Sequence, residues 1–390
     1  MSKAHKKALF LVIFTIATVL TYLRAIPQVS LTERAVVVGL GIDITEGGYK
    51  LTAQIINPQS KGQGGSEGAS DGYGIVSGEG ETLADAIGTI AQKTGLTVSL
   101  SQCNMIVLGD SVMKPLKFPA VNYLVQSYAV PELAIIAVTK GSAEKLFKTN
   151  PVLTRLSSFQ LQQTLHSATD NSEILSTNIK DFFDGYLSKT GIAPVVYVEA
   201  KEVDKESVDK ASEGGGDNYY EYDYTKVALF SPGKNALLLD PDDTNSINYM
   251  RYTLKRGGET ITLDDVVYHL TISGKNFKDD AVVSDGQAVY SAGLKLKMYI
   301  NEADDVTGCF SISEIPESVV ERIAGEVGAK IEKKIVGTFE KCRGEGYDVY
   351  GLYDKFYSMA YSDWKNVPSD GDYLDKIRFE IKISVSIVKK

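Results

Sequence analysis

The N-terminus constrains this chain more than any other feature. Lys3, Lys6 and Lys7 precede an uncharged apolar run, Ala8 to Leu23, which Arg24 closes. Basic residues before such a run favour an N-terminus inside and the following chain outside a membrane. The run is short for a spanning helix, which needs about 20 residues, and long for a signal-peptide core of about 7–15. Extension to Val29 would reach spanning length, with Arg24 reaching to the interface.

We therefore expect residues 1–29 to form an uncleaved membrane anchor, with a cleaved export signal as the alternative. Cleavage sites require two small residues, and Leu23–Arg24–Ala25 supplies one. A buried core helix is a third interpretation, which the absence of a polar face disfavours. Both the anchor and the signal place residues 30–390 outside the cytoplasm.

Length and charge limit the remaining options. The chain has 390 residues, enough for two or three domains, and 43% of them are hydrophobic, as in ordinary globular proteins. The net charge of −9 argues against binding to nucleic acid or to an anionic lipid surface.

The periodicity of the apolar residues predicts an α+β fold with mixed and antiparallel sheets and packed helices. Residues 34–43 and 49–56 form a predicted hairpin, and Thr82 with Asp85 forms a capping box before a helix. The remaining predicted strands are 104–108, 133–139, 194–203, 225–230, 235–239, 260–273 and 282–300. The remaining predicted helices are 110–127, broken by prolines, 157–168, 178–187 and 242–250, and Ser142 caps a further short helix.

A Gly-rich, charged stretch marks the clearest boundary. We expect an N-terminal α+β domain at 30–203, an acidic linker at 204–223, a small middle domain at 224–275 and a C-terminal α+β domain at 276–390. Residues 59–74 are rich in Gly and Ser and are a predicted loop.

The last domain is predicted to contain a long central helix over 313–342. Its apolar residues recur every four positions from Ile315 to Phe339, so the row winds around the helix. Different elements should contact it along its length, because a one-sided surface helix has a straighter stripe. Gly325, Gly328 and Gly337 each weaken it by about 1 kcal/mol relative to Ala, so tertiary packing must hold it. A second helix, 348–364 with Asp348 as N-cap, and a half-buried antiparallel strand, 377–387, follow.

Few residues suggest chemistry. The three histidines are scattered, the three cysteines form no metal or disulfide pattern, and a Cys309–Cys342 bridge is left open. Gly39–Leu40–Gly41 lacks the third glycine and the following helix of a dinucleotide loop, so a closely packed strand is expected.

Acidic residues are clustered at three places. Those at 240–243 are interpreted as a helix start, and those at 279–280 and 304–305 as turns. We predict no catalytic, cofactor or metal site.

Several short motifs, taken in order, resemble the Ger(x)C family, the C-type subunits of nutrient germinant receptors in bacterial endospores. The first strand, A-V-V-V-G-L-G-I-D, and the partner strand, Q-I-I-N-P, are similar to the first family motifs. An apolar strand ending in Gly, a P-E turn followed by K-G-S-A-E-K-L, and D-V-Y-G-L with W-K match the later ones. The residues that carry these motifs are Gly39, Gly41, Asp43, Asn57, Pro58, Gly109, Pro131, Glu132, Asp348, Gly351 and Trp364.

Two departures from the family pattern matter. The family lipidates a cysteine near the N-terminus, where this chain has Ala25, so no lipidation is expected and the apolar segment must tether the chain. A family proline is replaced by Tyr361, which affects a local turn only.

The resemblance implies a non-catalytic receptor subunit on the outer face of the spore inner membrane, assembled with A-type and B-type integral-membrane subunits. It implies neither enzymatic activity nor a cofactor. We expect the partner-facing surface around Tyr350, Tyr357, Tyr361 and Trp364, together with the 59–74 loop. An envelope hydrolase acting on cortex peptidoglycan and a small-molecule binding protein are the alternatives.

Overall fold

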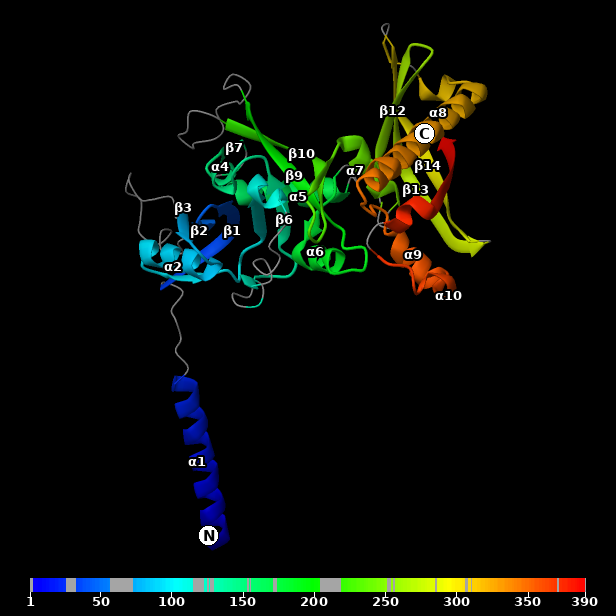
Figure 1. Ribbon diagram of the computed structural model, residues 1–390. Coiled ribbons are helices and arrows are strands. Elements are labelled where there is room, and N and C mark those ends of the chain that lie inside the picture. Colours follow the sequence, from blue (N-terminus) through cyan, green and yellow to red (C-terminus); the bar gives the residue numbers. More distant parts are fainter. Residues whose placement is uncertain are drawn as a thin grey trace.

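The computed structural model describes residues 3–25, 33–56, 73–114, 123–124, 126, 130–152, 154, 156–170, 174–203, 219–250, 254, 257–284, 286–305, 308–309, 311–369 and 372–389. Two sheets, each covered by helices, confirm the predicted α+β class (Figure 1). An N-terminal helix, α1 (Lys3–Ala25), precedes them. No helix within the described residues has the length and hydropathy needed to cross a membrane.

The first sheet has eleven strands, of which eight follow one path in the order β11-β10-β9-β6-β5-β1-β2-β3. Its centre is parallel, because β1, β5, β6 and β9 run in one direction, whereas β1, β2 and β3 form an antiparallel meander. The strands are β1 (Arg34–Thr45), β2 (Gly48–Ile56), β3 (Tyr73–Gly80), β4 (Thr97–Ser99), β5 (Met105–Gly109), β6 (Ile135–Thr139), β7 (Asn150–Pro151), β8 (Thr177–Asn178), β9 (Ala193–Val203), β10 (Tyr219–Phe230) and β11 (Leu237–Leu239).

Helices cover both faces of this sheet. Every residue of β5 is buried, as expected of a central parallel strand, and its side chains alternate between two cores. Ile106 and Leu108 face α2 (Leu83–Thr94) and α6 (Ile179–Tyr186), and Met105 and Val107 face α4 (Ala143–Phe147) and α5 (Ser157–Asp170). The predicted capping box of α2 is present, and the Ser142 side chain caps α4 as predicted.

The second sheet has five strands: β12 (Gly258–Leu263), β13 (Val266–Ser284), β14 (Gln287–Asp305), β15 (Gly308–Cys309) and β16 (Ile377–Val388). The strand predicted at 260–273 is wrong, since Asp264 and Asp265 adopt φ of 52° and 64° and turn the chain between β12 and β13. The turn predicted at Asp279–Asp280 is also wrong, because both residues lie within β13 and pair with β14.

The orientation of β16 corrects a further prediction. We expected an antiparallel strand, but β16 pairs with β14 in parallel over its whole length. After β14 the chain passes through α8 (Glu317–Gly344), α9 (Leu352–Met359) and α10 (Tyr361–Trp364) before it returns. Such a crossover brings the returning strand back in the same direction.

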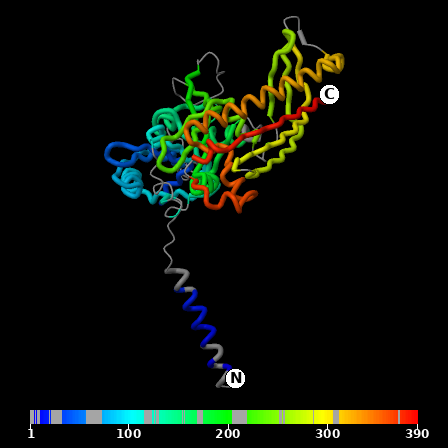
Figure 2. Tube along the Cα trace, turned by 45° about the vertical axis from the view of Figure 1, so that its right-hand side comes forward, coloured from blue at the N-terminus to red at the C-terminus, as the bar shows by residue number. Residues whose placement is uncertain are grey.

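The long helix α8 confirms the prediction made from its winding apolar row. Ile323, Val327, Ile331, Ile335 and Phe339 are buried in the core of the second sheet. At its C-terminal end, Cys342 joins a separate cluster with β10, β11 and α7 (Pro241–Met250). Figure 2 shows α8 (orange) crossing the strands of the second sheet toward the first.

The helix predicted at 348–364 is divided. α9 begins at Leu352, after Gly351 in the left-handed conformation with φ of 68°, so Asp348 is not its N-cap residue. Ala360 separates α9 from α10. Asp110–Met113 forms a short 3-10 helix at the start of the helix predicted at 110–127, and most of the remaining residues of that prediction lie outside the described ranges.

Two predicted segments lie mostly outside the described residues: the linker and the Gly- and Ser-rich loop. The motif residues Asn57 and Pro58 also lie outside them, within 57–72. Residues 219–223, which we placed in the linker, begin β10 and pair with β9, so the first sheet continues through Leu239. The division into domains remains a prediction. Cys342 is a free buried thiol, so the Cys309–Cys342 bridge is absent.

Candidate functional site

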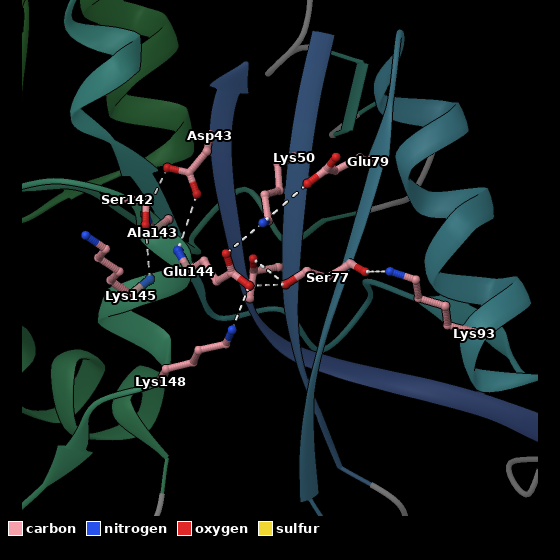
Figure 3. Close-up of polar contacts among 11 residues, drawn as sticks. Asp43, Lys50, Ser77, Glu79, Lys93, Ser142, Ala143, Glu144, Lys145 and Lys148 are labelled. Carbon is pink, nitrogen blue, oxygen red and sulfur yellow. Dashed lines mark hydrogen bonds and ion pairs between the residues drawn. The ribbon is translucent and has the colours of Figure 1, made fainter. Parts of the chain in front are cut away.

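The motif residues of the first sheet converge on the start of α4. The carboxylate of Asp43, at the end of β1, accepts hydrogen bonds from the backbone N–H of Ala143 at 2.9 Å and of Glu144 at 3.3 Å (Figure 3). Asp43 is only 6% exposed. Burial raises the pKa of its carboxyl, and the two backbone hydrogen bonds oppose that shift. Asp43 therefore joins two segments that are 100 residues apart in sequence.

The glycines of this motif allow close packing. A Cβ atom at Gly39 would lie 2.6 Å from Cβ of Ser158, and one at Gly41 would lie 2.9 Å from Cβ of Ala143. A Cβ at Gly109 would lie 1.9 Å from Oδ1 of Asp43. These three glycines therefore bring α4, α5 and β5 against β1, as expected of a closely packed strand.

Gln54 supplies a second buried connection, which sequence reasoning missed. Its side-chain nitrogen donates to the Phe147 carbonyl at 3.1 Å and to Ser157 Oγ at 2.8 Å, and its oxygen accepts from Ser158 N–H at 3.0 Å. All of these partners lie far away in the chain, so only its place in the Q-I-I-N-P motif could have drawn attention to it.

Charged side chains surround Glu144 on the adjacent surface. Its carboxylate lies 2.8 Å from Lys50 Nζ and 2.8 Å from Lys148 Nζ, and Ser77 Oγ donates to it at 3.2 Å (Figure 3). The hydrogen bonds from Lys148 and Lys50 lower the pKa of Glu144 from 4.5 to about 2. Each charge has an opposite partner, so the arrangement stabilises α4 against β2 and leaves no free acid or base at this point.

The turn before β6 has a comparable structural role. The Pro131 carbonyl accepts from Ala134 N–H at 2.9 Å, and the Glu132 carbonyl accepts from Lys180 N–H at 3.0 Å, in the first turn of α6. The P-E motif therefore positions α6 beside β6.

The C-terminal motif is organised around the Asp348 carboxylate. It accepts hydrogen bonds from the N–H groups of Leu352 and Tyr353 at 2.8 Å each and from the Tyr373 hydroxyl at 2.7 Å. Asp348 thereby accepts from two amides at the start of α9 that have no partner within the helix. Gly351, in the left-handed conformation, turns the chain between Asp348 and the helix.

The four aromatic residues expected to face partners differ widely in exposure. Trp364 is 4% exposed and stacks on Phe356 at 4.4 Å, so it belongs to the core. The Tyr350 hydroxyl donates to the Ile335 carbonyl at 3.0 Å, and Lys189 Nζ lies 3.0 Å from the ring centroid of Tyr357. Tyr361 is 53% exposed, and its ring contacts that of Tyr357.

Buried charges join α8 to its neighbours. The Asp243 carboxylate, on α7, accepts from the Thr338 hydroxyl at 2.8 Å and lies 2.6 Å from Lys341 Nζ. The acidic run at 240–243 thus begins a helix, as expected, and also holds α8. On β12, Glu259 lies 2.9 Å from Lys334 Nζ and accepts from the Tyr249 hydroxyl at 3.0 Å.

No cluster of His, Cys, Asp and Glu side chains suited to a metal ion occurs within the part of the chain that the structure describes. A groove of about 480 Å³ lies between α8 and β16. Its lining residues are small, apolar or acidic: Glu321, Ala324, Gly325, Gly328, Ala329, Glu332, Ile383 and Val385.

Comparisons with known proteins cover both sheets. Residues 27–198 match the model for the spore germination protein N-terminal domain, and residues 225–390 match the model described as spore germination B3/GerAC like, C-terminal. The chain belongs to the Ger(x)C family. A curated relative, spore germination protein KC of Bacillus subtilis (strain 168), is 22% identical over 92% of this chain and 89% of its own length.

A solved structure supports the fold. The crystal structure of the GerBC protein matches with a TM-score of 0.52 and 17% identity, covering 90% of this chain and 97% of the other. The two family-model matches confirm the Ger(x)C resemblance found in the sequence motifs, and the structure gives those motifs packing roles.

Replacing Gly39 with Ala should destabilise the protein by about 1–3 kcal/mol, because the new Cβ would meet Ser158 on α5 and force the helix away from β1. Gly47→Ala is the matched control, since a Cβ there has no atom within 4 Å. Urea unfolding of both variants measures the difference. Equal stability of the two variants would contradict the packing role of the motif.

The Glu144 network should also make stability depend on pH. A carboxyl whose folded pKa is lowered stabilises the fold above its unfolded value of 4.5, and that contribution disappears as pH falls toward about 2. Solvent screening limits the effect to about 1 kcal/mol. Glu144→Gln should therefore be less stable than wild type near neutral pH and nearly equal to it at the acidic end, as measured by urea unfolding across this range. A difference in unfolding free energy between Glu144→Gln and wild type that does not change with pH would refute the electrostatic role. The control is Glu46→Gln, in an exposed turn.

Proposed function

We propose that this chain is a non-catalytic subunit of a spore germinant receptor, needed for assembly of the receptor and for the response to nutrients. The observation that carries the proposal is the match of residues 27–198 and 225–390, in that order, to the two spore germination domain models. The compensated charges around Asp43, Glu144 and Asp348 support it, because their contacts serve packing rather than chemistry.

We further propose that the protein sits on the outer face of the spore inner membrane, tethered through residues 8–29, with A-type and B-type integral-membrane subunits as partners. The helical conformation of Lys3–Ala25 supports the tether, as do its exposed apolar side chains, among them Leu11 at 65% and Phe14 at 61%. Exposed apolar residues on a helix require cover by lipid or protein.

Deletion of the gene should leave spores intact but unable to respond to the nutrients that this receptor detects. The measurement is the loss of spore refractility after nutrient addition, compared with spores carrying a restored wild-type copy. Co-purification from detergent-solubilised spore membranes, followed by mass spectrometry, should identify the two integral-membrane subunits.

Normal nutrient responses of the deleted spores, in a strain without a second receptor of the same specificity, would overturn the proposed function. Recovery of the protein without any integral-membrane companion would overturn the proposed assembly.

A further inference from the structure

The outer edge of the second sheet is a regular strand without a strand neighbour. Within the described residues β16 pairs with β14 alone, through continuous register from Ile377 to Val388. Backbone groups on the other side of such a strand can pair with a further strand, which is how sheets recruit extended peptides.

Charge protects only one half of this edge. The outer face of the first half carries Arg378, Glu380 and Lys382, and Arg378 and Glu380 form an ion pair at 2.7 Å. Charged side chains of this kind discourage indiscriminate pairing of sheet edges. The second half, Ser384 to Val388, carries no charge on that face. Pairing is therefore least hindered over residues 383–388.

The inner face of β16 is incompletely covered. On β14, the inward side chains of Leu294, Leu296 and Met298 are buried. Their register partners on β16, Ile383, Val385 and Ile387, are only half-buried, although α8 packs against this strand. A strand added outside β16, about 4.8 Å away, would complete this apolar row.

The groove beside α8 lies where the inward side chains of an added strand would point. Ile383 and Val385, in the uncharged half of β16, form one wall, and Ala324, Gly325, Gly328 and Ala329 of α8 form the other. A Cβ at Gly325 would meet no atom within 4 Å, and one at Gly328 would meet only Val385, at an ordinary 3.7 Å. The packing of the chain itself therefore does not require either glycine, although both weaken the helix.

Acidic residues at the two ends of the groove indicate the charge of the occupant. Glu321 and Glu332 are exposed, form no ion pair with the described residues and lie about 16 Å apart along the helix axis. That length corresponds to about five residues of extended chain. Lys or Arg residues flanking a short apolar stretch would match both carboxylates.

The same acidic residues disfavour a second copy of this chain as the occupant. Pairing of two β16 edges about a twofold axis at the groove would bring two copies of α8 together around Gly325 and Gly328. Glu321 would then face Glu332 of the second copy, and like charges at such a contact oppose association.

We propose that β16 and the α8 groove form a docking site for an extended strand of a different protein, with alternating apolar residues that enter the groove and basic residues at both ends. This surface would serve the proposed receptor assembly. Its test uses purified full-length protein and a synthetic probe, so it can fail or succeed independently of any germination phenotype.

The probe is the peptide Thr-Lys-Thr-Val-Thr-Val-Thr-Lys-Thr, labelled with a fluorophore, and its binding to the detergent-solubilised protein is measured by fluorescence anisotropy. We expect saturable binding that weakens by about tenfold or more in Gly325→Leu, because the new side chain fills the groove. Gly337→Leu is the matched control, since Gly337 is an exposed glycine of the same helix with no atom within 4 Å of a Cβ and lies outside the groove. Both substitutions favour the helix, so folding is retained.

Two further peptides separate the contribution of backbone pairing from that of the charged ends. Replacing the central Thr by Pro removes a backbone donor and should abolish binding if the peptide adds to the sheet. Replacing both Lys by Glu should abolish binding to wild type and restore it to the double variant Glu321→Lys, Glu332→Lys.

Absence of saturable binding by the basic probe, or equal affinity in Gly325→Leu and Gly337→Leu, would overturn the proposal. Concentration-dependent dimerisation that Gly325→Leu abolishes and Gly337→Leu does not would also overturn it, in favour of a second copy.

Discussion

The contact of α8 with both sheets is the constraint on which the rest of the structure depends. Its apolar row winds around the helix, so α8 contacts several elements. Ile323 to Phe339 lie in the core of the second sheet, where β12, β16 and α7 pack on the helix, and Cys342 meets β10, β11 and α7. The Asp243–Thr338 and Asp243–Lys341 contacts fix the C-terminal half of the helix. An adjacent face of α8 lines the groove beside the edge strand β16.

Buried charge in this protein stabilises contacts between distant segments. Asp43, Glu259 and Asp348 are each taken out of water, and each recovers that cost through two or more hydrogen bonds or ion pairs. These contacts leave the carboxylates committed to the fold. Among the described residues, what remains available to a partner is backbone at a sheet edge, an apolar groove and two acids beside it that form no ion pair there, a combination that suits docking of a polypeptide.

Local signals in the sequence predicted local structure well. The Thr82–Asp85 capping box, the β1–β2 hairpin and the four-residue apolar period of α8 each depend on neighbouring residues, and each is present. The failures involve distant partners. Asp279 looks like a turn residue, but Lys355 and Tyr290 stabilise it within β13. The alternation of β16 predicts a strand but carries no information about its direction, which the α8 crossover determines.

In the candidate sites, too, sequence motifs identified residues but not their distant partners. Sequence motifs identified Gly39, Gly41, Asp43 and Asp348, but not that Asp43 and Gln54 hold α4 and α5 from across the sheet. Aromatic content suggested Trp364 as a surface residue, whereas its ring completes the core beside Phe356. The groove arises from the packing of α8 on β16 and has no local sequence signature beyond glycines that a helix would not otherwise favour.

We propose that the edge of β16 is the surface this protein offers to a strand of its partner. Hydrogen–deuterium exchange of the β16 amides measures this most directly, in the isolated protein and in the assembly solubilised from spore membranes. We expect amides in residues 383–388 to exchange more slowly in the assembly, while those of β5, already buried, change little. Equal exchange of the β16 amides in both states would contradict it.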